Sequence, residues 1–208
     1  MPLCDICSCC QATNENVYPL NDWVCIKAAE KGHIECLKYA HKNGCTIKKM
    51  AGELAAKNGH LECLIYAHEN GCPWDEWTCL YSAGNGHLEC LKYAHENGCP
   101  WNVSTCRIAA SSGHLKCLEY AYENGCPLDK KVCSQAAASG QLECLLYVLN
   151  NGCKWDKYDE YFASTKEKFD IFLLGTLNRN DNKSQIKYLV GDVIGIIHDY
   201  ILPSAVHH

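Results

Sequence analysis

The sequence predicts an all-α solenoid built from helical hairpins, and three observations lead to this fold class. A glycine followed by histidine, or once by glutamine, recurs every 27 residues: Gly32-His33, Gly59-His60, Gly86-His87, Gly113-His114 and Gly140-Gln141. Two columns of cysteines keep the same step: Cys36, Cys63, Cys90, Cys117, Cys144, and Cys45, Cys72, Cys99, Cys126, Cys153. The apolar residues between these markers fall at helical spacing. Self-similarity at such a period is the mark of a repeat architecture.

The composition narrows the class of protein. Of the 208 residues, 48% are hydrophobic, which is ordinary for a folded globular chain. The net charge of -5 argues against a nucleic-acid-binding surface, which normally carries clustered basic residues. We find no apolar run long enough to cross a membrane and no signal peptide, so a cytoplasmic, non-secreted protein is expected. In that compartment the 18 cysteines are expected to be reduced.

The repeat divides the chain into units with distinct ends. Five regular units are expected, followed by a degenerate sixth that keeps the apolar pattern but loses Gly-His and cysteine: 21–47, 48–74, 75–101, 102–128, 129–155 and 156–177. Residues 1–20 are expected to form a cysteine-rich N-terminal cap, residues 178–184 a polar linker, and residues 185–208 an amphipathic C-terminal helical cap. Terminal repeats are atypical because their outer face meets water.

Each unit is expected to hold two helices. In the third unit Asp75 is a suitable N-cap for the first helix, and Asn85-Gly86 ends it, because glycine adopts the left-handed conformation at little cost. The second helix runs from about Leu88 to Asn97. Pairs of small residues recur in the first helices and predict close helix packing. A tyrosine recurs in the second helices and predicts packing between units.

The repeated string Ala-Ala-x-x-Gly-His-Leu-x-x-Leu-x-Tyr, which ends in Asn-Gly, resembles an ankyrin repeat over residues 21–177. Two features depart from that family: the period is 27 rather than about 33 residues, and the Thr-Pro-Leu-His opening is absent. The shortfall lies where ankyrin repeats place a β-hairpin finger, so the fingers are expected to be short or absent. The resemblance also implies that the histidine of Gly-His fixes the turn between the two helices.

The string GHLECLKYAHENGCPW is similar to cysteine-rich ankyrin arrays of giant DNA viruses of amoebae and of some protists. That similarity implies a source and names no partner. For a viral source, we expect a protein that acts on a host factor in the host cytoplasm. Val190 to Leu202 resembles the first helix of an F-box, which implies a substrate adaptor for ubiquitin ligation.

Zinc binding and core packing are the two main interpretations of the cysteines, with disulfide bonds as a third. Cys79, Cys90, His95 and Cys99 supply the four ligands of a tetrahedral zinc site, and Cys4 with Cys7 supplies half of another. Against zinc, Cys90 and His95 lie about 140° apart around a helix and share no face. Buried cysteine packs like a small apolar side chain, so we favour core packing and expect no cofactor. A zinc-stabilised structural protein, such as a virion component, stays open as the alternative.

No motif in the sequence predicts catalysis. A nucleophile elbow, a P-loop and a dinucleotide fingerprint are all absent, and every recurring ionisable residue belongs to the repeat itself. Repeat solenoids typically offer an extended binding surface. The sequence therefore predicts a protein–protein interaction scaffold that is not an enzyme, with another protein as its partner and no nucleic acid, membrane or small-molecule substrate.

The first helices vary along one predicted face, which we interpret as a partner-binding groove. Positions spaced by four residues share a helical face. Residue type on this face changes from unit to unit, unlike in the core columns, yet large apolar residues recur there. Aromatic anchors are also favoured at interfaces. The predicted groove has apolar anchors and a charged end: Trp23, Ile26, Met50, Glu53, Trp77, Leu80, Arg107, Lys130 and Lys131. In the alternative, the two tryptophans are buried between helices.

Overall fold

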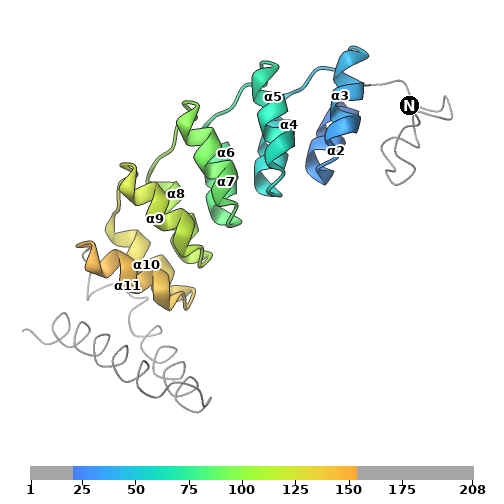
Figure 1. Ribbon diagram of the computed structural model, residues 1–208. Helices are drawn as coiled ribbons and strands as arrows, with labels where there is room; N and C mark the ends of the chain where they lie inside the picture. The colour runs from blue at the N-terminus through green and yellow to red at the C-terminus, as the bar shows by residue number, and fades with distance from the viewer. Residues whose placement is uncertain (1–20, 154–208) are drawn as a thin grey trace, which may run out of the picture. The chain divides into compact units, whose positions relative to one another are not determined.

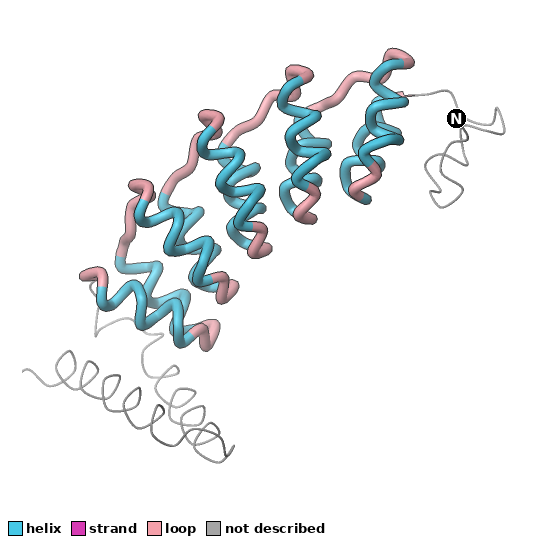
Figure 2. Tube along the Cα trace, in the orientation of Figure 1, coloured by secondary structure: helices cyan, strands magenta, loops and turns pink. Residues whose placement is uncertain are grey.

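The computed structural model describes residues 21–153, where ten helices form five hairpins and no strand occurs (Figure 1, Figure 2). The helices are α2 (Asp22–Lys31), α3 (Ile34–Lys42), α4 (Lys49–Lys57), α5 (Leu61–Glu69), α6 (Glu76–Gly84), α7 (Leu88–Glu96), α8 (Val103–Ser111), α9 (Leu115–Glu123), α10 (Lys130–Ala138) and α11 (Leu142–Asn150). The predicted all-α helical-repeat solenoid is confirmed for this part of the chain. The predicted N-terminal cap, sixth unit, linker and C-terminal cap lie outside the described residues.

The described chain divides into two compact units. The first contains residues 21–109 and 116–127, and the second contains 110–115 and 128–153. The first unit holds the hairpins α2/α3, α4/α5 and α6/α7 together with most of α8 and α9. None of the helices between residues 21 and 153 is long and apolar enough to span a membrane.

Local sequence signals set the helix ends. Asp75 caps α6 by accepting a hydrogen bond from the backbone N–H of Trp77 at 3.1 Å, as an aspartate N-cap should. Asn21 does the same for α2 by accepting from Trp23 N–H at 3.0 Å. Gly32 follows α2 with a φ of 73°, in the left-handed region that glycine tolerates. The helix ends predicted at Asp75, at Asn85-Gly86 and at Leu88 are therefore confirmed by α6 and α7.

The core lies between successive hairpins. One leucine from each second helix is completely or almost completely buried: Leu37, Leu64, Leu91, Leu118 and Leu145. In the first helices, alanine pairs such as Ala28-Ala29 and Ala55-Ala56 have no exposed surface. In the first unit α2 contacts α4, α4 contacts α6, and α3, α5 and α7 contact one another in the same order. The alanine pairs are therefore buried in first helices that contact one another, as the predicted close packing of small residues requires.

Short connectors replace the β-hairpin fingers, as the shortened period predicted. Residues 43–48 and 70–75 join one hairpin to the next without a strand (Figure 2). Polar contacts hold the first connector, because Thr46 N–H donates to Asp22 Oδ1 at 2.8 Å and Lys48 pairs with Asp22 at 2.7 Å. Each connector therefore ties its hairpin to the preceding first helix.

The family resemblance implied that the histidine of Gly-His fixes the turn of its own repeat. In the structure the contacts of His60 are made with the preceding hairpin. The His60 ring covers Gly32, where an added Cβ would lie 2.5 Å from His60 Nδ1. His60 Nε2–H donates to the Glu30 carbonyl at 3.1 Å. Gln141 covers Gly113 in the same way in the second unit. Glutamine therefore takes the same place over the glycine that histidine takes in the other repeats.

Two alanine substitutions should separate backbone conformation from this close contact. Gly59 and Gly71 both have positive φ, at 74° and 81°, but only Gly59 lies against a neighbouring ring, that of His87. We expect Gly71→Ala to cost about 1–2 kcal/mol from backbone strain alone. Gly59→Ala should cost roughly 1–3 kcal/mol more, because the new methyl group overlaps His87. Urea unfolding followed by circular dichroism measures both, and equal losses would contradict the contact.

His60 should also make stability depend on pH. Burial, with the neighbouring His87 and His33, lowers the pKa of His60 below its ordinary value of 6.5. As the pH falls below 6.5, His60 takes up a proton in the unfolded chain before it does so in the folded chain. The free energy of unfolding therefore decreases as the pH falls from 6.5 toward the lower pKa of the folded state. His60→Gln should lose less stability than the wild type between about pH 7.5 and pH 5.5. Parallel pH profiles of the two proteins would refute this.

Candidate interaction surface

Three large apolar side chains lie uncovered at the same position of three successive first helices. Trp23 in α2 is 55% exposed, Met50 in α4 is 48% exposed and Trp77 in α6 is 45% exposed. These residues are 27 apart, and all belong to the first unit. We call Trp23, Met50 and Trp77 the anchor column. Exposed large apolar side chains that recur at one position of successive repeats are typical of a contact site.

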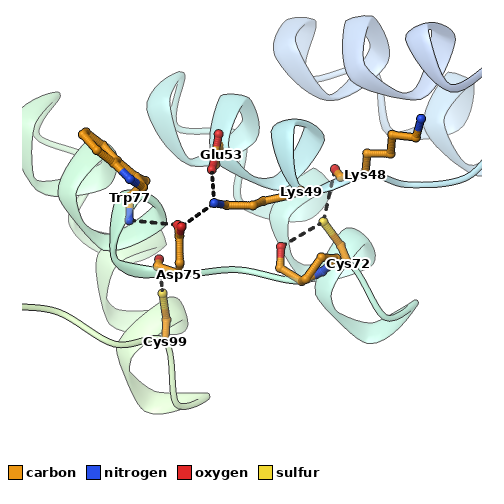
Figure 3. A network of polar contacts seen from close by, with 8 residues as sticks. Lys48, Lys49, Glu53, Cys72, Asp75, Trp77 and Cys99 are labelled. Carbon is orange, nitrogen blue, oxygen red and sulfur yellow. Dashed lines mark hydrogen bonds and ion pairs between the residues drawn. The ribbon is translucent and has the colours of Figure 1, made fainter.

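Neighbouring side chains one helical turn further on extend the anchor column. Tyr81 lies beside Trp77 with ring centroids 5.7 Å apart. Lys27 places its ammonium group 5.0 Å from the centre of the Trp23 ring, and Lys57 lies 5.8 Å from that of Tyr81. Figure 3 shows the Trp77 side chain directed away from the polar network that caps its helix. The rings of Trp23 and Tyr81 thus each have a lysine ammonium group over them, in a cation–π arrangement.

The charged groups around the anchor column are paired with one another. Three groups of ion pairs surround it: Lys27 with Glu30 at 2.6 Å, Asp22 with Lys48 at 2.7 Å, and Lys49 with both Glu53 at 3.3 Å and Asp75. Lys49 lies between the two carboxylates in Figure 3, and its hydrogen bond to Asp75 raises its pKa. The charges on this surface are therefore largely neutralised within the protein.

The structure corrects part of the predicted groove. Ile26 is only 7% exposed and packs in the core, so its placement on an open face is wrong. The physical reason is helix rotation: the open face follows Trp23 and Lys27, so the position of Ile26 turns inward. Glu53 and Leu80, at the same repeat position, are half-buried. The alternative in which both tryptophans are buried is also wrong.

The charged end predicted for the groove is divided between the two units. Arg107 is half-buried in α8 and belongs to the first unit. Lys130 and Lys131 are exposed at the start of α10, in the second unit. Of these three residues, Arg107 belongs to the same compact unit as the anchor column, and Lys130 and Lys131 do not.

Two other tryptophans have a different role from those of the anchor column. Trp74 stacks on His68 and Trp101 stacks on His95, each with ring centroids 3.7 Å apart. A tyrosine from the next hairpin closes each stack, because Tyr93 and Tyr120 meet the tryptophans edge-on. Hydrogen bonds of 3.0 and 3.2 Å join these tyrosine hydroxyls to His68 Nδ1 and His95 Nδ1. Tyr93 and Tyr120 therefore pack hairpin on hairpin, as predicted, whereas Tyr39 of the first hairpin is 40% exposed.

The repeat cysteines are buried, as core packing predicted. The free thiols in the described residues belong to Cys25, Cys45, Cys63, Cys72, Cys79, Cys90, Cys99, Cys106, Cys117, Cys126, Cys133, Cys144 and Cys153. Cys36 departs from the expectation of reduced thiols, because it is disulfide-bonded. Burial raises the pKa of Cys63, Cys90 and Cys117 to about 11, so these thiols stay protonated at neutral pH.

The four residues considered for zinc are not assembled into a site. Between residues 21 and 153, no three His, Cys, Asp or Glu side chains lie close enough to hold one ion. His95 is engaged by Trp101 and Tyr120 instead. Cys79 and Cys99 do lie together, which the sequence spacing did not single out as a pair. Cys4 and Cys7 fall outside the described residues.

Comparison with known proteins agrees with this geometry. Residues 25–105 match the family model for ankyrin repeats, in three copies. The crystal structure of the human ASB11 ankyrin repeat domain is similar, with a TM-score of 0.55 and 21% sequence identity, over 62% of this chain and 69% of that one. No curated protein matches the chain significantly. The described hairpins thus have the ankyrin-repeat fold, and the predicted resemblance is confirmed over the matched segment.

The two kinds of tryptophan should differ in their effect on stability. Trp101→Ala removes a stacked, half-buried ring between hairpins. It should lower the free energy of unfolding by about 3 kcal/mol, the lower end of the range for buried aromatic side chains. Trp77→Ala removes an exposed ring and should change stability by no more than about 0.5 kcal/mol. Urea unfolding of both variants measures this, and a larger loss for Trp77→Ala would place that ring in the core.

Proposed function

We propose that the chain is a protein–protein interaction scaffold whose anchor column binds an apolar segment of another protein. The observation that carries the proposal is the repeated exposure of Trp23, Met50 and Trp77 on three consecutive hairpins. A side chain exposed once on a surface is ordinary, but the same exposure at one repeat position builds a continuous strip. Tryptophan is also among the residues most often responsible for binding energy at interfaces.

The chemistry of the surface indicates the chemistry of the partner. Lys27, Lys49 and Asp22 are paired within the chain, so these charges are already engaged. The anchors themselves are two indole rings and a thioether side chain. The complementary partner is therefore a segment that buries apolar side chains, and charge steering contributes little to its affinity.

Finer proposals concern the source of the chain and its biological setting. The similarity of GHLECLKYAHENGCPW to arrays of giant viruses supports a viral protein that acts on a host factor in the host cytoplasm. The F-box-like string in Val190 to Leu202 supports a ubiquitin-ligase adaptor, although that segment lies outside the described residues. Capture experiments with and without residues 185–206 would test the adaptor role. The zinc-stabilised structural alternative has no supporting ligand cluster between residues 21 and 153.

The proposal predicts a specific loss of binding. A partner isolated by affinity capture is purified, and its dissociation constant is measured by calorimetry with the full chain. Trp23→Ala together with Trp77→Ala should weaken binding by at least about tenfold, because two exposed aromatic anchors are lost. Raising the salt concentration should change the affinity of the wild type only weakly, since the nearby charges are already paired.

Trp101→Ala is the matched control, because it removes the same indole from a stacking position away from the strip. At a temperature where it remains folded, its affinity should equal that of the wild type. If Trp101→Ala weakens binding as much as the double variant, or if the double variant binds normally, the partner does not use the anchor column.

A further inference from the structure

The anchor column presents one large apolar side chain on each of three successive hairpins. The helices that carry Trp23, Met50 and Trp77 contact one another in order, α2 with α4 and α4 with α6 (Figure 1). The axes of packed helices lie about 8–10 Å apart. Because the anchors occupy the same position in each repeat, they follow one another at about that step. A ligand that touches all three must therefore offer one contact about every 9 Å.

This step separates the regular conformations that a bound peptide can take. A polyproline II helix has three residues per turn and rises about 3.1 Å per residue, so every third residue lies on the same face about 9.3 Å further on. In a β-strand, residues on one face lie about 6.6 or 13 Å apart, and in an α-helix the seventh residue lies about 10.5 Å away. Only the polyproline II step falls within the spacing of packed helices.

The surroundings of the anchors also disfavour a β-strand and an α-helix. Residues 21–153 contain no strand, so they offer no sheet edge to which an extended peptide could add. An amphipathic helix buries an apolar stripe about 100° wide. The anchor column is narrow at its middle, because Met50 lies between Lys49 and Glu53, which form an ion pair at 3.3 Å. A polyproline II segment requires neither feature, since its backbone forms no internal hydrogen bonds and stays solvated.

An aromatic pair and a lysine lie at one end of the anchor column. Trp77 and Tyr81 are one helical turn apart, with ring centroids 5.7 Å apart and planes tilted by 36°. Proline-rich segments commonly dock on aromatic side chains. Lys57 lies 5.8 Å from the centre of the Tyr81 ring and forms no ion pair with any residue between 21 and 153. The charge complement of this end is therefore one carboxylate.

We propose that the segment bound by the anchor column is a proline-rich stretch in the polyproline II conformation, with an apolar residue at every third position and a carboxylate that pairs with Lys57. This inference rests on the proposed function and specifies the conformation and chemistry of the partner. An uncharged middle part complements a surface where Lys27 and Lys49 are already paired within the chain. Such a segment is largely ordered before it binds, so docking costs little conformational entropy.

Two synthetic peptides of identical composition test the spacing. Both have blocked termini and consist of prolines, three leucines and a glutamate at each end. The leucines lie at every third position in the first peptide and at every second position in the second. The first peptide should bind the full chain at least about tenfold more tightly in calorimetry, because only it can place a leucine at each anchor. Trp23→Ala together with Trp77→Ala should abolish this preference, whereas Trp101→Ala should keep it.

Met50 gives a direct readout at the middle of the anchor column. The chain contains two methionines, Met1 and Met50. Isotope-labelled methionine methyl groups therefore give two nuclear magnetic resonance signals, and Met50→Leu assigns them. The first peptide should shift the Met50 signal at saturation. The same peptide with alanine in place of its central leucine should produce a smaller shift, because that leucine is the one placed over Met50.

The carboxylate has a separate test. Replacing both glutamates of the first peptide by glutamine should weaken binding by about two- to fivefold, as expected for one exposed ion pair. Lys57→Gln should remove the difference between the two peptides, and it leaves Trp77 and Tyr81 in place. Equal affinity of the glutamate and glutamine peptides for the wild type would contradict the pairing with Lys57.

Three results would overturn the inference: equal affinity of the two leucine peptides, an unmoved Met50 signal, or tighter binding of an alanine-rich helical peptide with leucine at every seventh position. A captured partner distinguishes this inference from the proposed function. If the partner loses affinity for the Trp23→Ala, Trp77→Ala variant while the first peptide fails to displace it, the inference alone is wrong. If the partner binds that variant normally, the anchor column is not the site and both are wrong.

Discussion

Close approach between successive hairpins is the constraint on which the rest of the structure depends. A hairpin of two short helices cannot bury its apolar face alone, so it must pack against its neighbours. The approach requires alanine where first helices meet, as at Ala28 and Ala55, and glycine where a ring covers the backbone, as at Gly32 under His60. Between residues 21 and 153 the connectors contain no strand, so no β-hairpin finger separates one helical hairpin from the next. The same contacts leave one strip of each first helix outside the core, and the anchor column lies on that strip.

Much of this fold could be predicted from the sequence because its rules are local and repeated. The Asp75 cap, the Asn85 end and the span of the second helix all depend on residues within one turn, and the structure confirms each of them. The shortened connector also follows from the period alone. The partner of each Gly-His histidine could not be predicted, because His60 contacts Gly32 and Glu30 of the preceding hairpin. That contact depends on how the units stack, which the spacing of residues within one unit does not determine.

The candidate sites were predicted less well, and the reason is the rotation of the first helix. Periodicity shows that Trp23 and Ile26 belong to one helix. Three residues correspond to about 300° of rotation, so the two side chains point in directions only about 60° apart. A small error in the assumed direction of the core therefore exchanges the exposed and the buried position. The structure exposes Trp23 and buries Ile26. Likewise, Cys79 was grouped with Cys90, His95 and Cys99 by order along the chain. In the structure the Cys79 sulfur lies 3.9 Å from the Cys99 carbonyl oxygen, because the chain turns back after the second helix, whereas His95 contacts Trp101 and Tyr120.

Trp74 and Trp77 show why residue type alone cannot separate a packing role from a binding role. They lie three residues apart on either side of the Asp75 cap, and both look apolar and conspicuous in the sequence. Trp74 belongs to the connector, where it stacks on His68 and helps to join one hairpin to the next. Trp77 belongs to the helix, where the core is already closed by Cys79 and Ala83, and its ring remains in solvent. The helix cap between them is therefore the point at which the chain passes from holding its repeats together to presenting a surface.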